Sequence, residues 1–277
     1  MATMHPSATH PRTDDRVRQA ITVITFLATV AVNGAANVLP INGQTTAEIS
    51  DRFQVFVIPA GYVFSIWGLI YVLLGAFTID QARPSRATDP TLRRLGWLPA
   101  LTGVLNATWV VLFHYEVFAL TVPVMIALLA TLIAIAAIAF ADRDRLGIGR
   151  WTIRLPFSVY LGWITVATIA NIAQTLDALG FDAFGLPPEP VAGVVLLIGL
   201  TIGLTFVWRF ADVAYGLVIV WAYAGIVVQE QGTPIVPIVA GVGAVIMAVL
   251  VAQTLVTHRR PAATSMIGVV AEAAASA

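Results

Sequence analysis

Long apolar stretches alternate with short polar segments along almost the whole chain. A helix needs about 20 apolar residues to cross roughly 30 Å of hydrocarbon, and most of these stretches are close to that length. The pattern therefore predicts an all-α integral membrane protein, a bundle of eight spanning helices. The predicted helices cover residues 20–39, 57–79, 96–115, 117–140, 155–177, 190–208, 213–228 and 234–257.

The arginines gather on one side of these predicted helices. All 15 basic residues are arginine, and all except Arg52 fall in the two tails or in the gaps after the second, fourth and sixth helices. This group consists of Arg12, Arg16, Arg18, Arg83, Arg86, Arg93, Arg94, Arg143, Arg145, Arg150, Arg154, Arg209, Arg259 and Arg260. Cytoplasmic segments retain basic residues. Both tails, residues 1–19 and 258–277, are therefore predicted to be cytoplasmic.

The composition excludes several functional classes. With 58% hydrophobic and 11% charged residues, little of the chain is expected outside the lipid bilayer. No loop gathers enough basic residues to neutralise many phosphates, so a nucleic-acid partner is excluded. Cysteine and lysine are both absent. Disulfides, thiolate chemistry and lysine Schiff bases with retinal or pyridoxal phosphate are therefore excluded as well.

Glycines predict two faces of close helix packing. Gly61, Gly68 and Gly75 recur every seven residues in and just before the second helix, and Gly199 and Gly203 form a GxxxG pair in the sixth. Small residues let neighbouring membrane helices approach closely. Both sets are therefore interpreted as helix-contact positions.

Charged residues are expected only at the helix ends. Arg209 and Asp212 lie three residues apart after the sixth helix and are expected to form a local ion pair. No predicted helix contains a carboxylate well inside it. A proton-coupled transport path therefore has no obvious carrier.

Three tryptophans lie well inside predicted helices, although tryptophan usually collects at the membrane interfaces. Each shares one helical face with other aromatic or amide side chains. The three faces are Phe64, Trp67 and Tyr71 on the second helix; Asn106, Trp109 and Phe113 on the third; and Tyr160, Trp163, Ala167 and Asn171 on the fifth. An aromatic face interrupted by a small alanine can leave a slot beside the rings. Such a slot suits a flat apolar ligand, with the amide groups orienting it.

A purely structural role is the alternative for each of these residues. A tryptophan can fill the core of a bundle, and an asparagine can hydrogen-bond a neighbouring helix for about 0.6 kcal/mol. For any one residue the structural role is favoured, because buried polar groups usually find structural partners. Three such faces on three helices together favour a pocket. Asn33 and Asn37 on the first helix could face the same cavity.

Three sequence blocks resemble one known family. PAGYVFSIWGLIY at residues 59–71, followed by Gly75, is similar to the second-helix signature of the tryptophan-rich sensory protein/translocator protein (TspO/MBR) family. LNATW at residues 105–109 resembles its third-helix block. YLGW at residues 160–163, with Ala167 and Asn171 after it, resembles its fifth-helix block. The blocks occur in the family's order, within about residues 17–177.

The resemblance implies a five-helix core over residues 20–177 and a three-helix extension over residues 178–257. It also implies a pocket between the five helices for tetrapyrroles, sterols or other flat lipophilic molecules, beneath the loop that joins the first two helices, here Pro40–Phe56. A bound tetrapyrrole would be a ligand rather than an obligatory cofactor, and no metal site is expected. The family usually forms homodimers, but three further helices follow the core here, so a homo-oligomer stays an open alternative.

Three functions remain open at this point. The first is a receptor or sensor that binds a flat lipophilic ligand. The second is a transporter of such molecules, in which the last three helices complete a translocation path. The third, an integral-membrane enzyme, is disfavoured because the sequence has no histidine cluster, no paired carboxylates within the helices and no nucleophile–base arrangement, so no catalytic residue is assigned.

Overall fold

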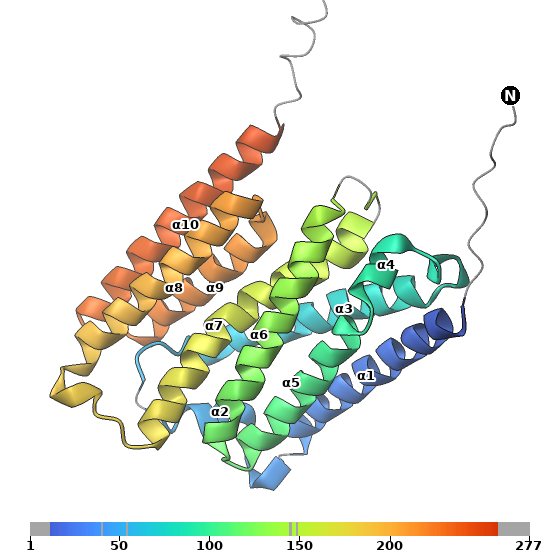
Figure 1. Ribbon diagram of the computed structural model, residues 1–277. Coiled ribbons are helices and arrows are strands. Elements are labelled where there is room, and N and C mark those ends of the chain that lie inside the picture. Colours follow the sequence, from blue (N-terminus) through green and yellow to red (C-terminus); the bar gives the residue numbers. More distant parts are fainter. Residues whose placement is uncertain (1–11, 40, 54, 144–145, 148, 260–277) are drawn as a thin grey trace, which may run out of the picture.

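The computed structural model describes residues 12–259 apart from 40, 54, 144–145 and 148, and the described chain is helical without strands (Figure 1). Its long helices are α1 (Thr13–Val38), α3 (Ile66–Ala82), α5 (Leu98–His114), α6 (Phe118–Ala141), α7 (Leu155–Ala178), α8 (Pro188–Phe210), α9 (Val213–Gln229) and α10 (Ile235–Arg259). The short elements are η1 (Ile41–Gly43), α2 (Thr46–Ser50), η2 (Gly61–Ser65), η3 (Pro84–Arg86), α4 (Pro90–Leu95), η4 (Arg150–Arg154) and η5 (Ala183–Gly185).

The chain is a multi-pass integral membrane protein. Six helical segments, which contain α1, α3, α6, α7, α8 and α10, are long and apolar enough to cross a membrane. α5 and α9 are apolar but shorter, at 17 residues each. The eight long helices coincide with the eight predicted stretches to within a few residues, except at two helix starts. That all eight cross the bilayer stays a prediction. Most of the C-terminal tail lies outside the described residues.

The first helix begins seven residues earlier than the apolar pattern predicts. Its additional turns are mostly polar, and three of their side chains, those of Asp15, Arg18 and Gln19, are buried against the α3–α5 connection. The Arg18 guanidinium donates hydrogen bonds to the carbonyls of Leu92 and Ala87 at 2.8 and 3.0 Å. Asp15 forms a two-point ion pair with Arg93. Because these contacts replace water, the helix extends beyond its apolar part.

The regular α-helix of the second predicted stretch begins nine residues later than predicted, at Ile66. Residues 57–60 are not helical, and η2 precedes α3. Here the amide of Ala60 donates to the carbonyl of Gly225 in α9 at 3.2 Å. The indole of Trp221 donates to the carbonyl of Val63 at 3.2 Å. Backbone groups that a helix would have satisfied internally are thus satisfied by α9.

α7 lies at the centre of the bundle (Figure 1). In its most apolar part 72% of the residues are buried, against at most 44% in the other five candidate spans. It packs against α6 and α3, and also against α9. From α6 the packing continues to α5 and α1, and from α9 it continues to α10 and α8. α7 therefore connects the last three long helices to the other four of the first five.

The glycines confirm one predicted packing face and correct the other. A Cβ at Gly199 would lie 2.9 Å from Ile169, and one at Gly203 would lie 2.9 Å from Met247, so this pair is a close helix contact as predicted. Gly61 and Gly68, in contrast, have no atom within 4 Å of the position of a Cβ. The prediction for these two was wrong, whereas a Cβ at Gly75 would lie 3.5 Å from the ring of Phe26 in α1, an ordinary packing contact. A seven-residue spacing identifies a common face of a helix but not the direction in which that face points.

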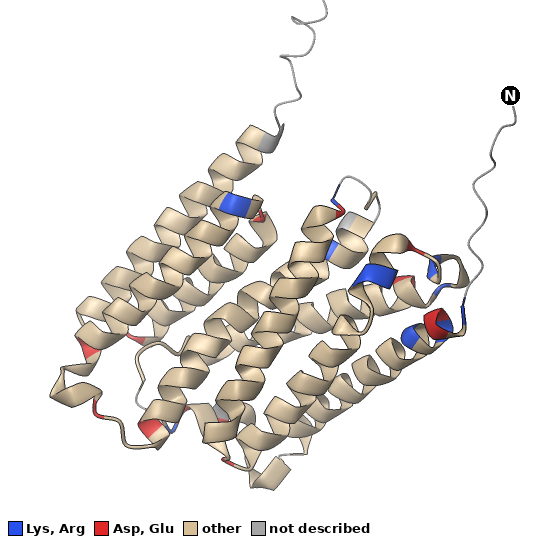
Figure 2. Ribbon diagram, viewed as in Figure 1, with Lys and Arg blue, Asp and Glu red and all other residues tan. Residues whose placement is uncertain are grey.

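Ion pairs connect the polar ends of the first helices. Asp142 binds Arg94 and accepts a hydrogen bond from Thr91 at 3.0 Å. Asp80 pairs with Arg86 at 3.1 Å. Figure 2 shows that the basic residues of α1, α4 and α8 lie at the same end of the bundle, while acidic residues predominate at the opposite end. The arginines therefore stabilise this end of the bundle through ion pairs.

Candidate functional site

Aromatic side chains of η2, α3 and α7 form one contiguous cluster. Trp67 stacks on Tyr71 at 5.5 Å between ring centroids. It also meets Tyr160 and Trp163 of α7 edge-on, at 5.9 and 6.3 Å. Phe64 contacts Trp163 at 5.6 Å. Five of the predicted site residues are thus brought together, because Phe64 at the end of η2 and Trp67 and Tyr71 of α3 are turned towards the i, i+3 pair of α7.

The remaining aromatic residues of the predicted site belong to a second row. Trp109 stacks on Phe113 at 4.9 Å, and Phe113 contacts Phe118 of α6 at 5.6 Å. Phe118 in turn meets Phe53, from the loop between α2 and α3, at 5.1 Å. This row runs from the interior of α5 to the α1–α3 connection. Trp109 has no ring contact with Trp67 or Trp163.

Asparagines connect these rows to neighbouring helices. Asn106, which is 1% exposed, accepts a hydrogen bond from Asn33 of α1 at 2.8 Å. It also interacts with the hydroxyl of Tyr160, so it connects α5 to the aromatic cluster on α7. Asn171, equally buried, donates to the hydroxyl of Thr121 in α6 at 2.9 Å. Each amide therefore has at least one structural partner.

Several polar atoms of the predicted site nevertheless have no partner. In the described part of the chain, five buried side-chain polar atoms lack a hydrogen bond, and four of these belong to predicted site residues. They are the Tyr71 hydroxyl, the indole nitrogens of Trp109 and Trp163, and Oδ1 of Asn171. An unsatisfied buried polar group costs about 1–3 kcal/mol, so proteins seldom keep one without a reason. The unsatisfied groups coincide with the aromatic rows.

The space beside the first cluster is small. A void of about 20 Å³ is bordered by Tyr71 and Tyr160 together with Thr29, Gly103 and Phe157. This volume holds about one water molecule. Ala167, one turn from Trp163, is half-buried and packs against the hydrophobic core. In this conformation the rings are therefore closed upon one another.

The α1–α3 connection covers the end of the second aromatic row. Asn42 donates to the carbonyl of His114 at 3.0 Å, and Arg52 pairs with Glu116 at 2.8 Å. The hydrogen bond from Arg52 holds the pKa of the Glu116 carboxyl below its usual range. His114 is fully buried, with Nδ1 2.8 Å from the carbonyl of Val110. These contacts hold the cover in place over α5.

Sequence reasoning did not identify three partners of the site. Phe53 and Phe118 lie in or next to polar connections, where an aromatic residue is normally assigned to the interface. Thr121 gave no signal, because threonines are frequent in these helices and most hydrogen-bond to their own helix. Only its alignment with Asn171 on the neighbouring helix distinguishes it.

The expected ion pair between Arg209 and Asp212 is wrong. Asp212 instead accepts a hydrogen bond from Ser158 of α7 at 2.5 Å and lies 3.8 Å from Nε of Arg154. The Arg209 guanidinium lies over the ring of Phe210 at 5.6 Å. The helix ends between these two residues, at the left-handed Ala211. The i, i+3 geometry of a continuous helix is therefore lost.

Comparison with known proteins gives one match. No curated protein and no solved structure matches the chain significantly. A model of the family described as TSPO-like protein matches residues 19–253. The match includes the aromatic rows and continues through α8 and α9 into α10, so the last three helices lie within the matched region. The chain belongs to the family of TSPO-like proteins.

Proposed function

We propose that the protein is a membrane receptor that binds a flat lipophilic ligand, of the tetrapyrrole or sterol class, between its aromatic rows. One observation carries the proposal: four of the five unpartnered buried polar atoms in the described chain lie on the predicted site residues. A ligand with acceptor groups at its edge satisfies the indole and phenol donors there. Its flat face stacks on the rings.

Ligand entry requires the closed rings to separate. A void of about 20 Å³ is far smaller than the 300–1,000 Å³ of a typical ligand site. The contacts of Phe64 in η2 and Trp67 in α3 with Trp163 in α7 are the ones that must open. Aromatic pairs contribute about 0.5–1.5 kcal/mol each. Stacking on the ligand replaces the ring contacts that opening breaks.

A binding role is favoured over proton-coupled transport. The buried carboxylates of the described residues are Asp15, Asp80, Asp142 and Asp212, and each pairs with an arginine. Three of them lie in or next to the ends of helices and the fourth in the first turn of α1. A path through the bundle therefore has no carboxylate at its middle to carry a proton.

The ligand proposal predicts saturable quenching of tryptophan fluorescence by protoporphyrin IX in detergent. Replacing Trp163 with phenylalanine removes the indole N–H and part of the stacking surface. We expect this change to weaken binding roughly twofold to tenfold, since the lost stacking is worth about 0.5–1.5 kcal/mol. Trp151→Phe is the matched control, because Trp151 is 66% exposed and lies in η4, outside both rows. Unchanged affinity in Trp67→Phe, Trp109→Phe and Trp163→Phe alike would assign all three rings to packing alone.

The distribution of arginines predicts the topology. Reporter fusions after Arg86 and after Arg145 are expected to report a cytoplasmic position, as is a fusion at the C-terminus. Fusions after Gln44 and Asp182 are expected to report the opposite side. The measurement is the activity of a compartment-specific reporter at each site. A C-terminus on the same side as Gln44 contradicts the predicted eight spans.

A further inference from the structure

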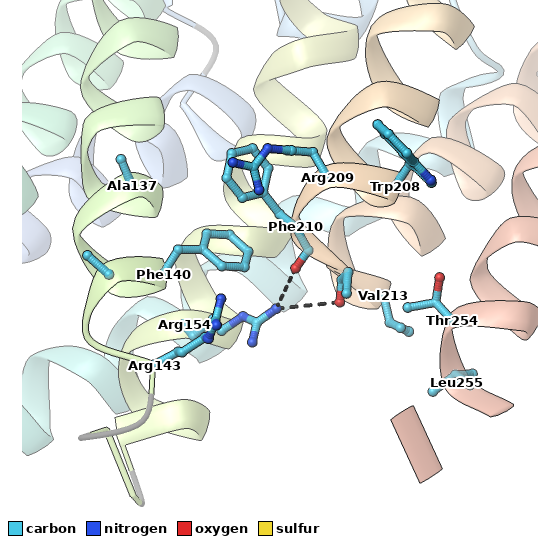
Figure 3. Close-up of a pocket in the computed structure, with 12 residues that line it drawn as sticks. Ala137, Phe140, Arg143, Arg154, Trp208, Arg209, Phe210, Val213, Thr254 and Leu255 are labelled. Carbon is cyan, nitrogen blue, oxygen red and sulfur yellow. Dashed lines mark hydrogen bonds between the residues drawn. The ribbon is translucent and has the colours of Figure 1, made fainter. Parts of the chain in front are cut away.

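A large hollow opens where the last three helices meet the first five, at the arginine-rich end. Its volume is about 980 Å³, and it is bordered by the ends of α6, α8 and α10, the start of α9, and η4 (Figure 3). It is separate from the aromatic rows, because it shares none of their residues. The proposed ligand site therefore leaves it unexplained.

The polar part of this hollow is basic. Arg143, Arg154 and Arg209 line it, and none of the described lining residues is acidic. Figure 3 shows Arg154 directed at the end of α8, where it donates to the carbonyls of Phe210 and Ala211 at 3.4 and 3.5 Å. Its guanidinium also lies 4.4 Å from the ring centroid of Phe140. Arg154 is thus fixed by the protein itself.

The two described aspartates nearest to these arginines in the sequence are buried and have partners of their own. Asp142 binds Arg94 and Thr91. Asp212 is 2% exposed, accepts hydrogen bonds from Ser158 and from the backbone of α9, and lies 3.8 Å from Nε of Arg154. In the described residues Arg209 has no carboxylate within ion-pair distance, only the ring of Phe210. The hollow therefore presents the guanidinium of Arg209 to an incoming anion, with those of Arg143 and Arg154 beside it.

Apart from Thr254, the rest of the lining is apolar, and part of it is exposed. Trp208 is 77% exposed, and Leu255 on α10 is 41% exposed. Ala137 and Val213 continue the apolar surface. Exposed tryptophan beside arginine is typical of a membrane interface. An anion held here thus has room for hydrocarbon chains along α8 and α10.

We infer that this hollow binds the headgroup of an anionic phospholipid, with the phosphate at the arginines and the acyl chains against the surface around Trp208 and Leu255. A basic pocket between transmembrane helices on the cytoplasmic side suits such headgroups, and the cytoplasmic leaflet is the one that carries anionic lipids. A free phosphate satisfies the arginines equally well but leaves the exposed apolar lining uncovered. The lipid satisfies both.

The test is native mass spectrometry of the full-length protein in detergent with added phosphatidylglycerol or phosphatidylcholine. We expect tighter binding of phosphatidylglycerol. Arg143→Gln and Arg209→Gln are each expected to weaken phosphatidylglycerol binding roughly fivefold. The double variant is expected to weaken it about twenty-five-fold. Arg83→Gln is the matched control, because Arg83 is exposed at the same end of the bundle but outside the hollow. Both substitutions spare the anchored Arg154.

Location is tested separately. Phosphatidylglycerol with brominated acyl chains is expected to quench the fluorescence of Trp208. This quenching is expected to disappear in Trp208→Phe and to persist in Trp97→Phe. Three outcomes overturn the inference: equal binding of phosphatidylcholine, an equal loss of affinity in Arg83→Gln, or displacement of the lipid by equimolar inorganic phosphate. The last of these would identify a site for free anions.

Discussion

Replacing Asp212 with alanine is expected to lower the free energy of unfolding by about 2–4 kcal/mol. The carboxylate caps α9 by accepting from the amide of Tyr215 at 3.1 Å, and an N-cap is worth about 1 kcal/mol. It also accepts a hydrogen bond from the buried hydroxyl of Ser158. In the variant this hydroxyl loses its partner, at a cost of about 1–3 kcal/mol. The measurement is thermal unfolding of the purified protein in detergent.

Two further variants separate these contributions. Asp212→Asn keeps an oxygen for the cap and for Ser158 but loses the charge facing Arg154. It is expected to retain most of the stability, because that ion pair is long, at 3.8 Å. Asp182→Ala removes a comparable cap in an exposed loop and is expected to change stability by less than about 0.5 kcal/mol. Equal unfolding temperatures for the wild type and Asp212→Ala contradict the assigned role.

Replacing Gly225 with alanine is expected to destabilise the fold by about 1–3 kcal/mol through overpacking. The new methyl group would lie 2.2 Å from Cγ2 of Val63 and 3.1 Å from Cβ of Pro59. Valine is stiff at χ1, so it cannot turn away without moving the backbone that hydrogen-bonds α9. The expected result is a lower unfolding temperature in detergent.

Gly68→Ala is the matched control, because no atom lies within 4 Å of its Cβ position. It should be neutral or slightly stabilising, since alanine favours a helix more than glycine does. In a double-mutant cycle, Val63→Ala removes the colliding methyl group. Gly225→Ala is then expected to cost less than it does alone. An equal cost in both backgrounds would show that Val63 is not the obstacle.

The apolar pattern predicts the long helices well, because each consists of a nearly continuous apolar run. It does not predict α4, which depends on its Asp89 cap and on ion pairs with distant residues. It also misplaces the start of α3, where the contact with Gly225 of α9 replaces the helical hydrogen bonds. The boundary at residue 178 between core and extension stays a prediction, and contacts between α7 and α9 join the two parts.

The structure brings only some of the predicted site residues together, for a geometric reason. Helical spacing places Phe64, Trp67 and Tyr71 on one face, and the same rule places Tyr160 and Trp163 on another. Which faces meet depends on how each helix is rotated in the bundle, and spacing alone does not contain that information. Trp109 therefore pairs with Phe113 and lies in a different row from Trp163.

The hydrogen bond between Trp221 and Val63 has a consequence for synthesis. The two residues are 158 positions apart in the chain. At about 5–20 residues per second on the ribosome, Trp221 emerges roughly 8–30 s after Val63. During that interval the carbonyl of Val63 and the amide of Ala60 await their partners in α9. The segment before α3 thus reaches its final conformation only after α9 has been inserted, so the order of assembly differs from the order of translation.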